Sequence, residues 1–494
     1  MEMHRRNFIK ITGAAAAAHS LNIVKAANRK KMNVLFIAVD DMNDWVGCLG
    51  GNSQAITPNM DKFAAQQGIV MNKAYCASTV CCPSRTAILT GKNASTTGVY
   101  GNGNNLKAAP KAKDVVTLPE YFGKHGYHTL STGKIFHKHA TEAGLDEGQW
   151  AYKEHVVARG KGSVINKIEP PPVEGVIAGG TDFAWGAVDA KLEETKDYVA
   201  CEWGADQLDR DFDDKPFFMA IGVSKPHLPW YVPQEFFDMY PLDTFEAPEF
   251  RRDDLDDITD ENGKVAFKPS SRFILADKGG MHKDAARAYI AAVSYADACL
   301  GVLLDKLAKS KYADNTIVML WGDHGWHLAE KLHYGKTGLW EESDRVPFIV
   351  SVPGVTPAGT KCNGVVSLLD MYPTLLDLCG LPPNPENEGR SFAKLLGNPK
   401  MEWKYPTLTT MGFKNHSVFD GRYRYSWYGG KGEGIEELYD LEADPMGFDN
   451  LINISKYGPV IARLKKRLPK HNEPEAPKNT IDKARKKELM RNAQ

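Results

Sequence analysis

Two segments of the sequence place acidic side chains directly after an apolar run. Asp40 and Asp41 follow the run Asn33–Val39, and Asp323 and His324 follow the run 316–321. Ligands of open α/β sheets lie at the carboxyl ends of the strands, so we expect these segments to meet at one site. Two adjacent carboxylates repel each other unless a cation lies between them. A set of mostly oxygen ligands favours Ca²⁺ there, with Mg²⁺ as the second choice.

Two alternatives stay open for these residues. An Asp-Asp pair standing alone could be a solvated pair in a turn. A two-zinc hydrolase would need more histidines; His327 could supply one, but a pocket or packing role suits it better.

The segment CASTVCCPSRTAILTG, Cys76 to Gly91, puts two adjacent cysteines at the start of a predicted helix. A helix N-terminus attracts anions, so an anionic substrate would be favoured beside Cys81. The other cysteines show neither metal-finger nor redox spacing, and most of them are expected to be small buried apolar residues. One disulfide is compatible with an oxidising compartment, but the sequence does not give its pairing.

Composition and charge narrow the class of protein. The chain has 494 residues, 43% hydrophobic and 25% charged, which is typical of a large globular α/β domain with a smaller one. Its formal net charge is −1, so no overall field attracts nucleic acid or an anionic membrane. Beyond the N-terminal segment, no part of the sequence is predicted to span a membrane.

The N-terminus has the pattern of an export signal. Arg5 and Arg6 form a twin-arginine pair, followed by a short, weakly hydrophobic stretch that ends near Ala27. We therefore predict a twin-arginine signal peptide over residues 1–27, transport of the folded protein by that export machinery, and a periplasmic or secreted product. A basic, Ala-rich cytosolic helix is the alternative. Export after folding would let a cytoplasmic enzyme modify a cysteine first.

Strand and helix patterns alternate along the chain, which favours a mostly parallel sheet with helices on both faces. Strands are predicted at 33–39, 127–130, 216–223, 316–321 and 347–352, and helices at 58–68, 285–310 and 368–380. A Pro/Asn/Gly-rich stretch near residue 398 suggests a boundary. We expect a catalytic domain over 30–398 and a C-terminal α+β subdomain with a basic tail over 399–494.

The cysteine segment resembles a known family signature. Cys81, Pro83, Ser84, Arg85, Leu89, Thr90 and Gly91 match the CxPSRxxxLTG motif of the type I, formylglycine-dependent sulfatases. The segments VLFIAVDD, STGKIFH, KPHLP, GDHG and ELYDLEADP are similar to further family segments, so the resemblance spans about residues 33–451. The details look closest to the iduronate-2-sulfatase-like branch, which includes bacterial polysaccharide sulfatases. The motif leaves one residue between its cysteine and its proline, which selects Cys81 over Cys82.

The resemblance implies an alkaline-phosphatase-like sulfatase fold and a set of roles. A cytoplasmic formylglycine-generating enzyme would convert Cys81 to formylglycine, whose hydrate attacks sulfur and later expels sulfate. Ca²⁺ would be held by the side chains of Asp40, Asp41, Cys81, Asp323 and His324. Arg85 would orient the nucleophile, and His137 would assist release. Lys134, His227 and Lys336 would bind the sulfate, with His227 as a further candidate for general acid.

The expected substrate is a sulfated carbohydrate, polysaccharide or oligosaccharide. Trp230, His333 and His416 are predicted to lie at the pocket rim and bind it, together with Trp326 and Trp340; packing roles are the alternative for these side chains. Two other functions stay open. A phosphonate or phosphodiester hydrolase of the same superfamily could share the motif, and a non-catalytic carbohydrate-binding homologue would keep an unmodified thiol at Cys81.

Overall fold

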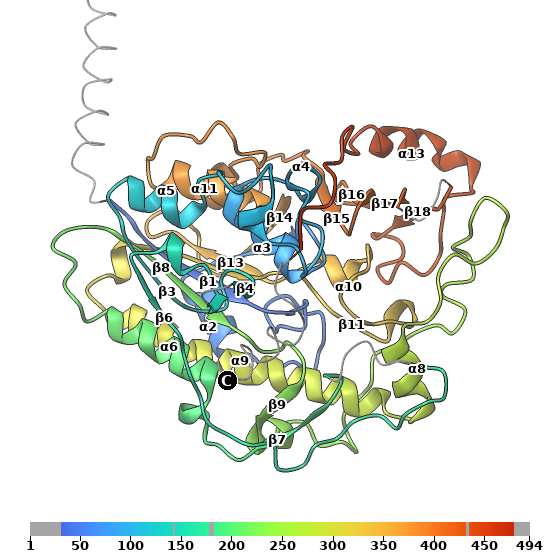
Figure 1. Ribbon diagram of the computed structural model, residues 1–494, viewed down its shortest axis with the longest axis horizontal. Helices are drawn as coiled ribbons and strands as arrows, with labels where there is room; N and C mark the ends of the chain where they lie inside the picture. Colours follow the sequence, from blue (N-terminus) through green and yellow to red (C-terminus); the bar gives the residue numbers. More distant parts are fainter. Residues whose placement is uncertain (1–30, 142–143, 177–181, 431–433, 479–494) are drawn as a thin grey trace, which may run out of the picture.

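The computed structural model describes residues 31–141, 144–176, 182–430 and 434–478. Its centre is an eight-stranded sheet (Figure 1). In spatial order the strands are β14 (Thr360–Ser367), β2 (Ile69–Tyr75), β13 (Phe348–Ser351), β10 (Thr316–Gly322), β1 (Asn33–Val39), β8 (Phe217–Val223), β3 (His128–Gly133) and β6 (Glu154–Val156). The predicted strands are confirmed, while β2, β6 and β14 were not predicted.

The middle of the sheet is parallel. β1 pairs in parallel with β10 on one side and with β8 on the other, and β8 pairs in parallel with β3. The last residue of β1, Val39, lies beside Gly322 and Val223, the last residues of its two neighbours. Only β13 among these eight strands runs against its neighbours β10 and β2. The carboxyl ends of β10, β1, β8 and β3 therefore share one edge.

Helices cover both faces of the sheet, as the alternating pattern predicts. Below the sheet in Figure 1 lie α2 (Pro58–Gln66), α6 (Lys196–Gln207) and α9 (His282–Lys309), and above it lie α3 (Cys81–Thr90), α5 (Leu118–Lys124) and α11 (Met371–Leu378). Alternate residues of β1 face two separate cores. Leu35 and Ile37 belong to the core between the sheet and α9, whereas Val34 and Phe36 belong to the core between the sheet and α3.

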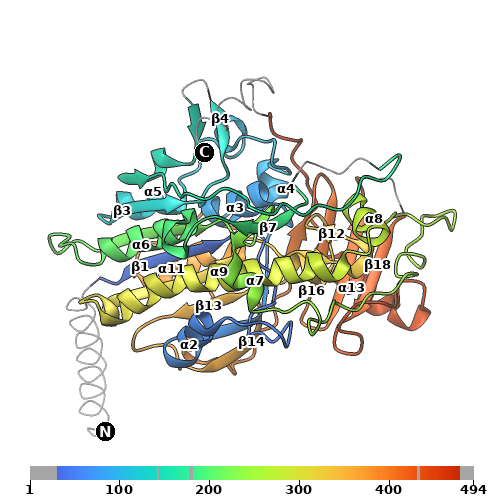
Figure 2. The same cartoon turned by 90° about the horizontal axis from the view of Figure 1, so that it is seen from below.

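The long helix α9 tests the expectation that no segment after the N-terminus spans a membrane. By length and mean hydropathy it could span a membrane, although no such segment was predicted. Its apolar window is 83% buried against the sheet and neighbouring helices (Figure 2). We therefore assign it to the protein core.

A separate antiparallel sheet follows the main domain. Its strands are β15 (Thr407–Thr410), β16 (Asn415–Phe419), β17 (Tyr423–Tyr428) and β18 (Glu436–Asp440), and α13 (Gly458–Lys465) packs on it through Leu464. The chain then returns to the main domain, where Ala476 N donates to Gly98 O over 2.7 Å. This is the α+β composition predicted for the C-terminal part. The predicted signal peptide and the end of the basic tail lie outside the described residues.

Candidate active site

Loops from four adjacent strand ends meet above the sheet edge. Asp40 and Asp41 follow β1, Asp323 and His324 follow β10, Lys134 follows β3, and His227 follows β8. Cys81 opens α3 beside them, with its Sγ 3.2 Å from His324 Nε2 and 3.8 Å from Asp41 Oδ1. The residues predicted for the metal and the nucleophile are therefore in one place.

The backbone at Asp41 is held in an unusual conformation. Its φ is +61°, in the left-handed region that non-glycine residues rarely adopt. Asp323 Oδ1 accepts from Asp41 N over 3.1 Å, and the hydroxyl of Tyr289 in α9 donates to Asp41 O over 2.9 Å. These two bonds fix the direction in which the Asp41 carboxylate points.

Arg85 connects the two acidic segments. Its Nε lies 2.8 Å from Asp323 Oδ2 and an outer nitrogen lies 3.3 Å from Asp40 Oδ1. The guanidinium also donates to the carbonyls of Lys134 and Ile135, and the Lys134 ammonium binds Asp40. Since Arg85 is fully buried, it does not contact solvent, and this network fixes the carboxylates of Asp40 and Asp323.

Lys336 reaches the same centre from a tightly turned loop. Its Nζ lies 2.8 Å from Cys81 Sγ and 2.7 Å from Asp41 Oδ1. The loop has positive φ at Leu332, Gly335 and Thr337. His333 Nε2 bonds to the Lys336 carbonyl over 2.9 Å, which holds the main chain behind the lysine. His333 thus lies next to the site, and its contact with substrate stays a prediction.

The donor set fits a divalent cation. One atom from each of Asp40, Cys81, Asp323 and His324 lies within 4.8 Å of the others, and a second such group contains Asp40, Asp41, Cys81 and His227. Asp41 Oδ2 is buried and accepts no hydrogen bond within the described part of the chain. Burial raises the pKa of Asp323 to about 6, against the opposing effect of Arg85. An added cation would satisfy the oxygen and favour the ionised carboxylates.

The two adjacent cysteines have different surroundings. Burial and Asp40 oppose ionisation of Cys81, but Lys134, Lys336 and His324 outweigh them and hold the pKa of its thiol well below the usual value. Cys82 points away, with its Sγ 3.5 Å from the carbonyl of Asn104, and burial raises the pKa of its thiol to about 12. The structure therefore distinguishes the two cysteines, and it places Cys81 among the charged groups.

His227 approaches from the opposite side. Its Nε2 lies 3.9 Å from Asp41 Oδ2, and its side chain is 32% exposed. Burial opposes protonation of the ring, but Asp41 and Asp40 outweigh it and raise the pKa of His227. The partly exposed ring, whose protonated form these carboxylates favour, suits an anionic ligand.

Some predicted rim residues need correction. Trp230 is fully buried among Phe183, Trp185, Tyr289 and Trp326, so it cannot touch a substrate. His416 is also fully buried, and its two ring nitrogens bond to Thr410 and Asn472. Both side chains have packing roles, and Trp326 and Trp340 are buried as well.

Two other histidines of the sequence analysis, His137 and His327, lie near the site. His137 is half-buried and lines a small hollow with Arg85, Phe136 and Trp150. Arg85 connects this hollow with the carboxylates that it binds. His327 is fully buried against the rings of His333 and Trp340. Packing, the preferred expectation for His327, fits this position.

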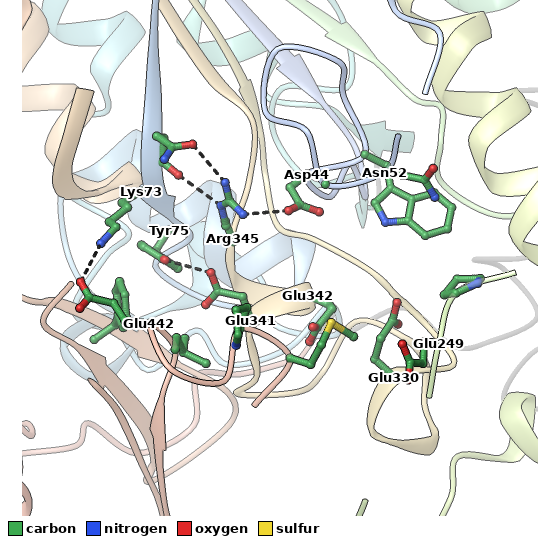
Figure 3. Close-up of a pocket in the computed structure, with 18 of the residues that line it drawn as sticks. Asp44, Asn52, Lys73, Tyr75, Glu249, Glu330, Glu341, Glu342, Arg345 and Glu442 are labelled. Carbon is green, nitrogen blue, oxygen red and sulfur yellow. Dashed lines mark hydrogen bonds and ion pairs between the residues drawn. The ribbon is translucent and has the colours of Figure 1, made fainter. Parts of the chain in front are cut away.

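A large hollow elsewhere is unsuited to the predicted substrate (Figure 3). It has a volume of about 420 Å³, and none of the predicted site residues lines it. Two cations, Lys73 and Arg345, face six carboxylates, from Asp44, Glu249, Glu330, Glu341, Glu342 and Glu442. This excess of negative charge would repel a sulfate ester.

The residues that support the site from a distance were not predicted from the sequence. Tyr289 holds Asp41 from a helix almost 250 positions away, and no local pattern indicates that contact. Asp197 accepts from the main-chain nitrogens of Ser224 and Lys225, at the start of the His227 loop. Lys225 itself could have been noticed, since it stands two residues before His227.

Known proteins resemble this chain along most of its length. A family model described as Sulfatase matches residues 32–381, and one described as N-sulphoglucosamine sulphohydrolase, C-terminal, matches residues 322–474. A sulfatase of Formosa agariphila is 38% identical over 450 residues, covering 90% of this chain and 87% of that protein. The iduronate 2-sulfatase of Mus musculus is 26% identical over 523 residues, covering 88% and 93%.

Solved structures share the fold. One, bound to its substrate D-glucosamine-2-N,6-O-disulfate, has a TM-score of 0.68 at 20% identity and covers 89% of this chain and 97% of its own. The phosphonate monoester hydrolase of Agrobacterium radiobacter has a TM-score of 0.67 at 19% identity, with coverages of 88% and 94%. At these identities the likeness concerns the fold alone.

The family is therefore defined by the matched models and by the bacterial relative. The chain belongs to the sulfatase family, and its large sheet with flanking helices is the alkaline-phosphatase-like fold of that family. It is a sulfuric ester hydrolase.

Proposed function

We propose that this sulfatase hydrolyses sulfate esters of a carbohydrate, with Cys81 in its formylglycine form and Ca²⁺ as cofactor. One observation carries the proposal. Cys81 Sγ lies 2.8 Å from Lys336 Nζ and 3.2 Å from His324 Nε2, at the edge where the buried carboxylates converge. Relatives named iduronate 2-sulfatase and N-acetylglucosamine-6-O-sulfatase support a sugar substrate.

Two groups would complete the centre. Formylglycine at position 81 would supply, as its hydrate, an oxygen nucleophile with a second hydroxyl for release of sulfate. Ca²⁺ would be held by Asp40, Asp41, Asp323 and His324 together with residue 81, and would act as a Lewis acid. The mostly oxygen donor set favours Ca²⁺ over Mg²⁺ and zinc.

The protein's own cations would bind the sulfate. Asp40 raises the pKa of Lys134 and Asp41 raises that of Lys336, in both cases against burial, so both ammonium groups stay charged. They approach the Cys81 region from β3 and from the Lys336 loop. Fixed cations of this kind stabilise the charge that accumulates on sulfate oxygens as the ester bond breaks.

His227 would transfer the proton that the leaving alcohol needs. Against the effect of burial, Asp41 and Asp40 raise the pKa of His227 and so favour its protonated form, and its partial exposure leaves room for the sugar oxygen. His137 would assist release of sulfate from the side of Arg85. General acids of this kind accelerate reactions by about 10²–10⁴-fold.

The location of the enzyme is part of the proposal. The twin-arginine pair Arg5–Arg6 supports export of the folded protein to the periplasm or beyond. Cys81 is fully buried in the fold, so conversion by a formylglycine-generating enzyme would take place in the cytoplasm before folding and export are complete. Export machinery and this maturation enzyme are the proposed partners.

The reaction is tested by comparing esters of one alcohol. Matured protein should release 4-nitrophenol from 4-nitrophenyl sulfate far faster than from the corresponding phosphate or phosphonate. The likeness in fold to a phosphonate monoester hydrolase makes that alternative worth this direct comparison. Faster turnover of the phosphorus esters would favour the alternative. A protein without turnover and with a thiol at Cys81 after co-expression with a maturation enzyme would favour a binding role.

The substrate is tested with a panel of defined sulfated oligosaccharides and sulfate release as the readout. We expect release from at least one sugar sulfate. Turnover of aryl sulfates without any release from the panel would contradict the carbohydrate assignment while leaving the sulfatase reaction in place.

A further inference from the structure

The loop between β8 and β9 (Trp230–Pro233) carries His227 and is braced from within. Each carbonyl from Pro226 to Pro229 accepts from a side chain of this loop or of Trp230, the first residue of β9. The bonds are Trp230 Nε1 to Pro226 O at 2.8 Å, Lys225 Nζ to His227 O at 3.0 Å, His227 Nδ1 to Leu228 O at 2.5 Å and Lys225 Nζ to Pro229 O at 2.6 Å. Lys225 alone accounts for two of these four bonds.

The bond to Leu228 determines which nitrogen of His227 is available. A carbonyl oxygen only accepts, so Nδ1 must carry a proton and donate to it. The ring then presents Nε2 to the centre, 3.9 Å from Asp41 Oδ2. The proton that His227 can transfer is therefore the one on Nε2, and its position depends on the carbonyls of this loop.

Burying the ammonium group of Lys225 to hold a loop costs free energy, which suggests that the geometry of this loop matters. Its ammonium group binds two main-chain carbonyls, and burial lowers the pKa of Lys225 to about 8 against the effect of Asp197. Its own main-chain nitrogen donates to Asp197 Oδ2 over 2.9 Å, which ties the start of the loop to α6. The lysine thus links a rigid helix to the carbonyls on both sides of Leu228.

We propose that Lys225 is a positioning residue for proton transfer by His227. The inference rests on the proposed function, in which the S–O bond of the ester breaks and its electron pair stays on the leaving oxygen. The sulfur is bonded by the ionised hydroxyl oxygen of the hydrated residue 81, and the Nε2 proton of His227 moves to the leaving oxygen. Lys225 touches neither the substrate nor the proton, and it fixes the ring that delivers the proton.

The test exploits the dependence of proton transfer on the leaving group. A strongly acidic phenol leaves without help, whereas a weakly acidic one needs the proton. In Lys225→Met, kcat/KM should fall about 100-fold for 4-methoxyphenyl sulfate but only about threefold for 4-nitrophenyl sulfate, since displacing a catalytic group by about 1 Å costs about that much. A plot of log kcat/KM against phenol pKa should become steeper.

Control variants separate positioning from general damage. Lys196→Met removes an exposed lysine of α6 and should leave the plot unchanged. Lys225→Gln keeps one donor and should give an intermediate slope, and it serves if Lys225→Met does not fold. Equal losses for all phenols in the folded variants would overturn the inference. A wild-type protein inactive on every sulfate ester would instead contradict the proposed function.

Two further measurements do not depend on the leaving group. In a His227→Ala background, Lys225→Met should cost less than twofold in kcat/KM, because the residue that it positions is gone. In ¹⁵N-histidine-labelled Cys81→Ala protein, the His227 signal should be that of the Nδ1-protonated tautomer or of the doubly protonated ring, and it should change in Lys225→Met. Additive losses, or an unchanged signal, would contradict the role of Lys225.

Discussion

Arg85 and Arg424 are both fully buried, and each binds two carboxylates, yet their surroundings differ. Arg85 belongs to the catalytic cluster, which we define as Asp40, Asp41, Arg85, Asp323 and Lys336. Arg424 of β17 binds Glu341 and Asp344 of α10 (Glu341–Asp344), and these three residues form the interface cluster between the main domain and the C-terminal sheet.

The two clusters differ in how completely their oxygens are paired. In the interface cluster, Thr409 and Tyr75 donate to the carboxylate oxygens that Arg424 leaves free. In the catalytic cluster, Asp41 Oδ2 has no hydrogen-bond donor among the described residues. A cluster whose carboxylate oxygens are all paired can hold two parts of a fold together, whereas a buried carboxylate oxygen without a donor can accept a ligand.

The largest expected effect comes from the catalytic cluster. Asp323→Asn should lower kcat/KM for sulfate esters by about 10⁴-fold, about 5.5 kcal/mol of transition-state stabilisation, because a metal ligand and the partner of Arg85 are lost together. The measurement is steady-state kinetics on folded protein. Asp314→Asn, an exposed change before β10, is the control. A loss below tenfold in Asp323→Asn would remove Asp323 from the catalytic centre.

The second effect concerns stability. Arg424→Met should lower the free energy of unfolding by about 3–5 kcal/mol, because it leaves the buried Asp344 and the partly buried Glu341 without their cation. Activity per folded molecule should stay within about threefold of wild type. Denaturant unfolding with parallel activity assays measures both. Arg463→Met breaks an exposed ion pair with Asp420 and should cost less than about 1 kcal/mol. Similar losses in the two variants would contradict a buried structural cluster.

The strand pattern could predict the carboxylates of the catalytic cluster, whereas Arg85 and Lys336 come only from the family resemblance and the interface cluster was not predicted. Asp40, Asp41, Asp323 and His324 each follow a continuous apolar strand, and parallel strands bring such ends together. Arg424 meets its partners across about 80 residues of chain, and nothing local to either segment indicates the pairing.

The lack of a local pattern also explains the other differences between the predictions and the structure. Strand β14 mixes exposed and buried residues, and the polar residues of β2 interrupt its apolar run, so neither gave a clear pattern. The direction of β13 depends on which neighbours it pairs with, which its four residues do not encode. Trp230 and His416 were placed at the rim because aromatic type and chain position do not reveal burial.

A smaller effect is expected from the cation that contacts both Asp41 and Cys81. Lys336→Met should reduce kcat about 10²–10³-fold, as the loss of one fixed charge at a developing anion does. KM should change less than kcat, because the interaction strengthens in the transition state. Lys311→Met, an exposed lysine before β10, should behave like wild type in the same assay. A change in KM alone would mean that Lys336 only binds the ground state.

The smallest expected effect is the stabilisation of the protein by Ca²⁺, which should differ between variants of the two clusters. Adding Ca²⁺ at about 100 times its dissociation constant should stabilise the chelator-treated wild type by about 2.7 kcal/mol. Arg424→Met should gain the same amount from a lower starting point, while Asp323→Asn should gain little. Thermal unfolding with and without Ca²⁺ measures this. An equal gain in Asp323→Asn would place the ion outside the catalytic cluster.

The central claim is that Cys81, and not its neighbour Cys82, becomes the catalytic group. The most direct measurement is tandem mass spectrometry of the tryptic peptide 74–85 from active protein made with a maturation enzyme. We predict an aldehyde at position 81 and an intact thiol at position 82, with Cys81→Ala inactive and Cys82→Ala active. A thiol at Cys81 in protein that turns over sulfate esters at the full rate would contradict the account.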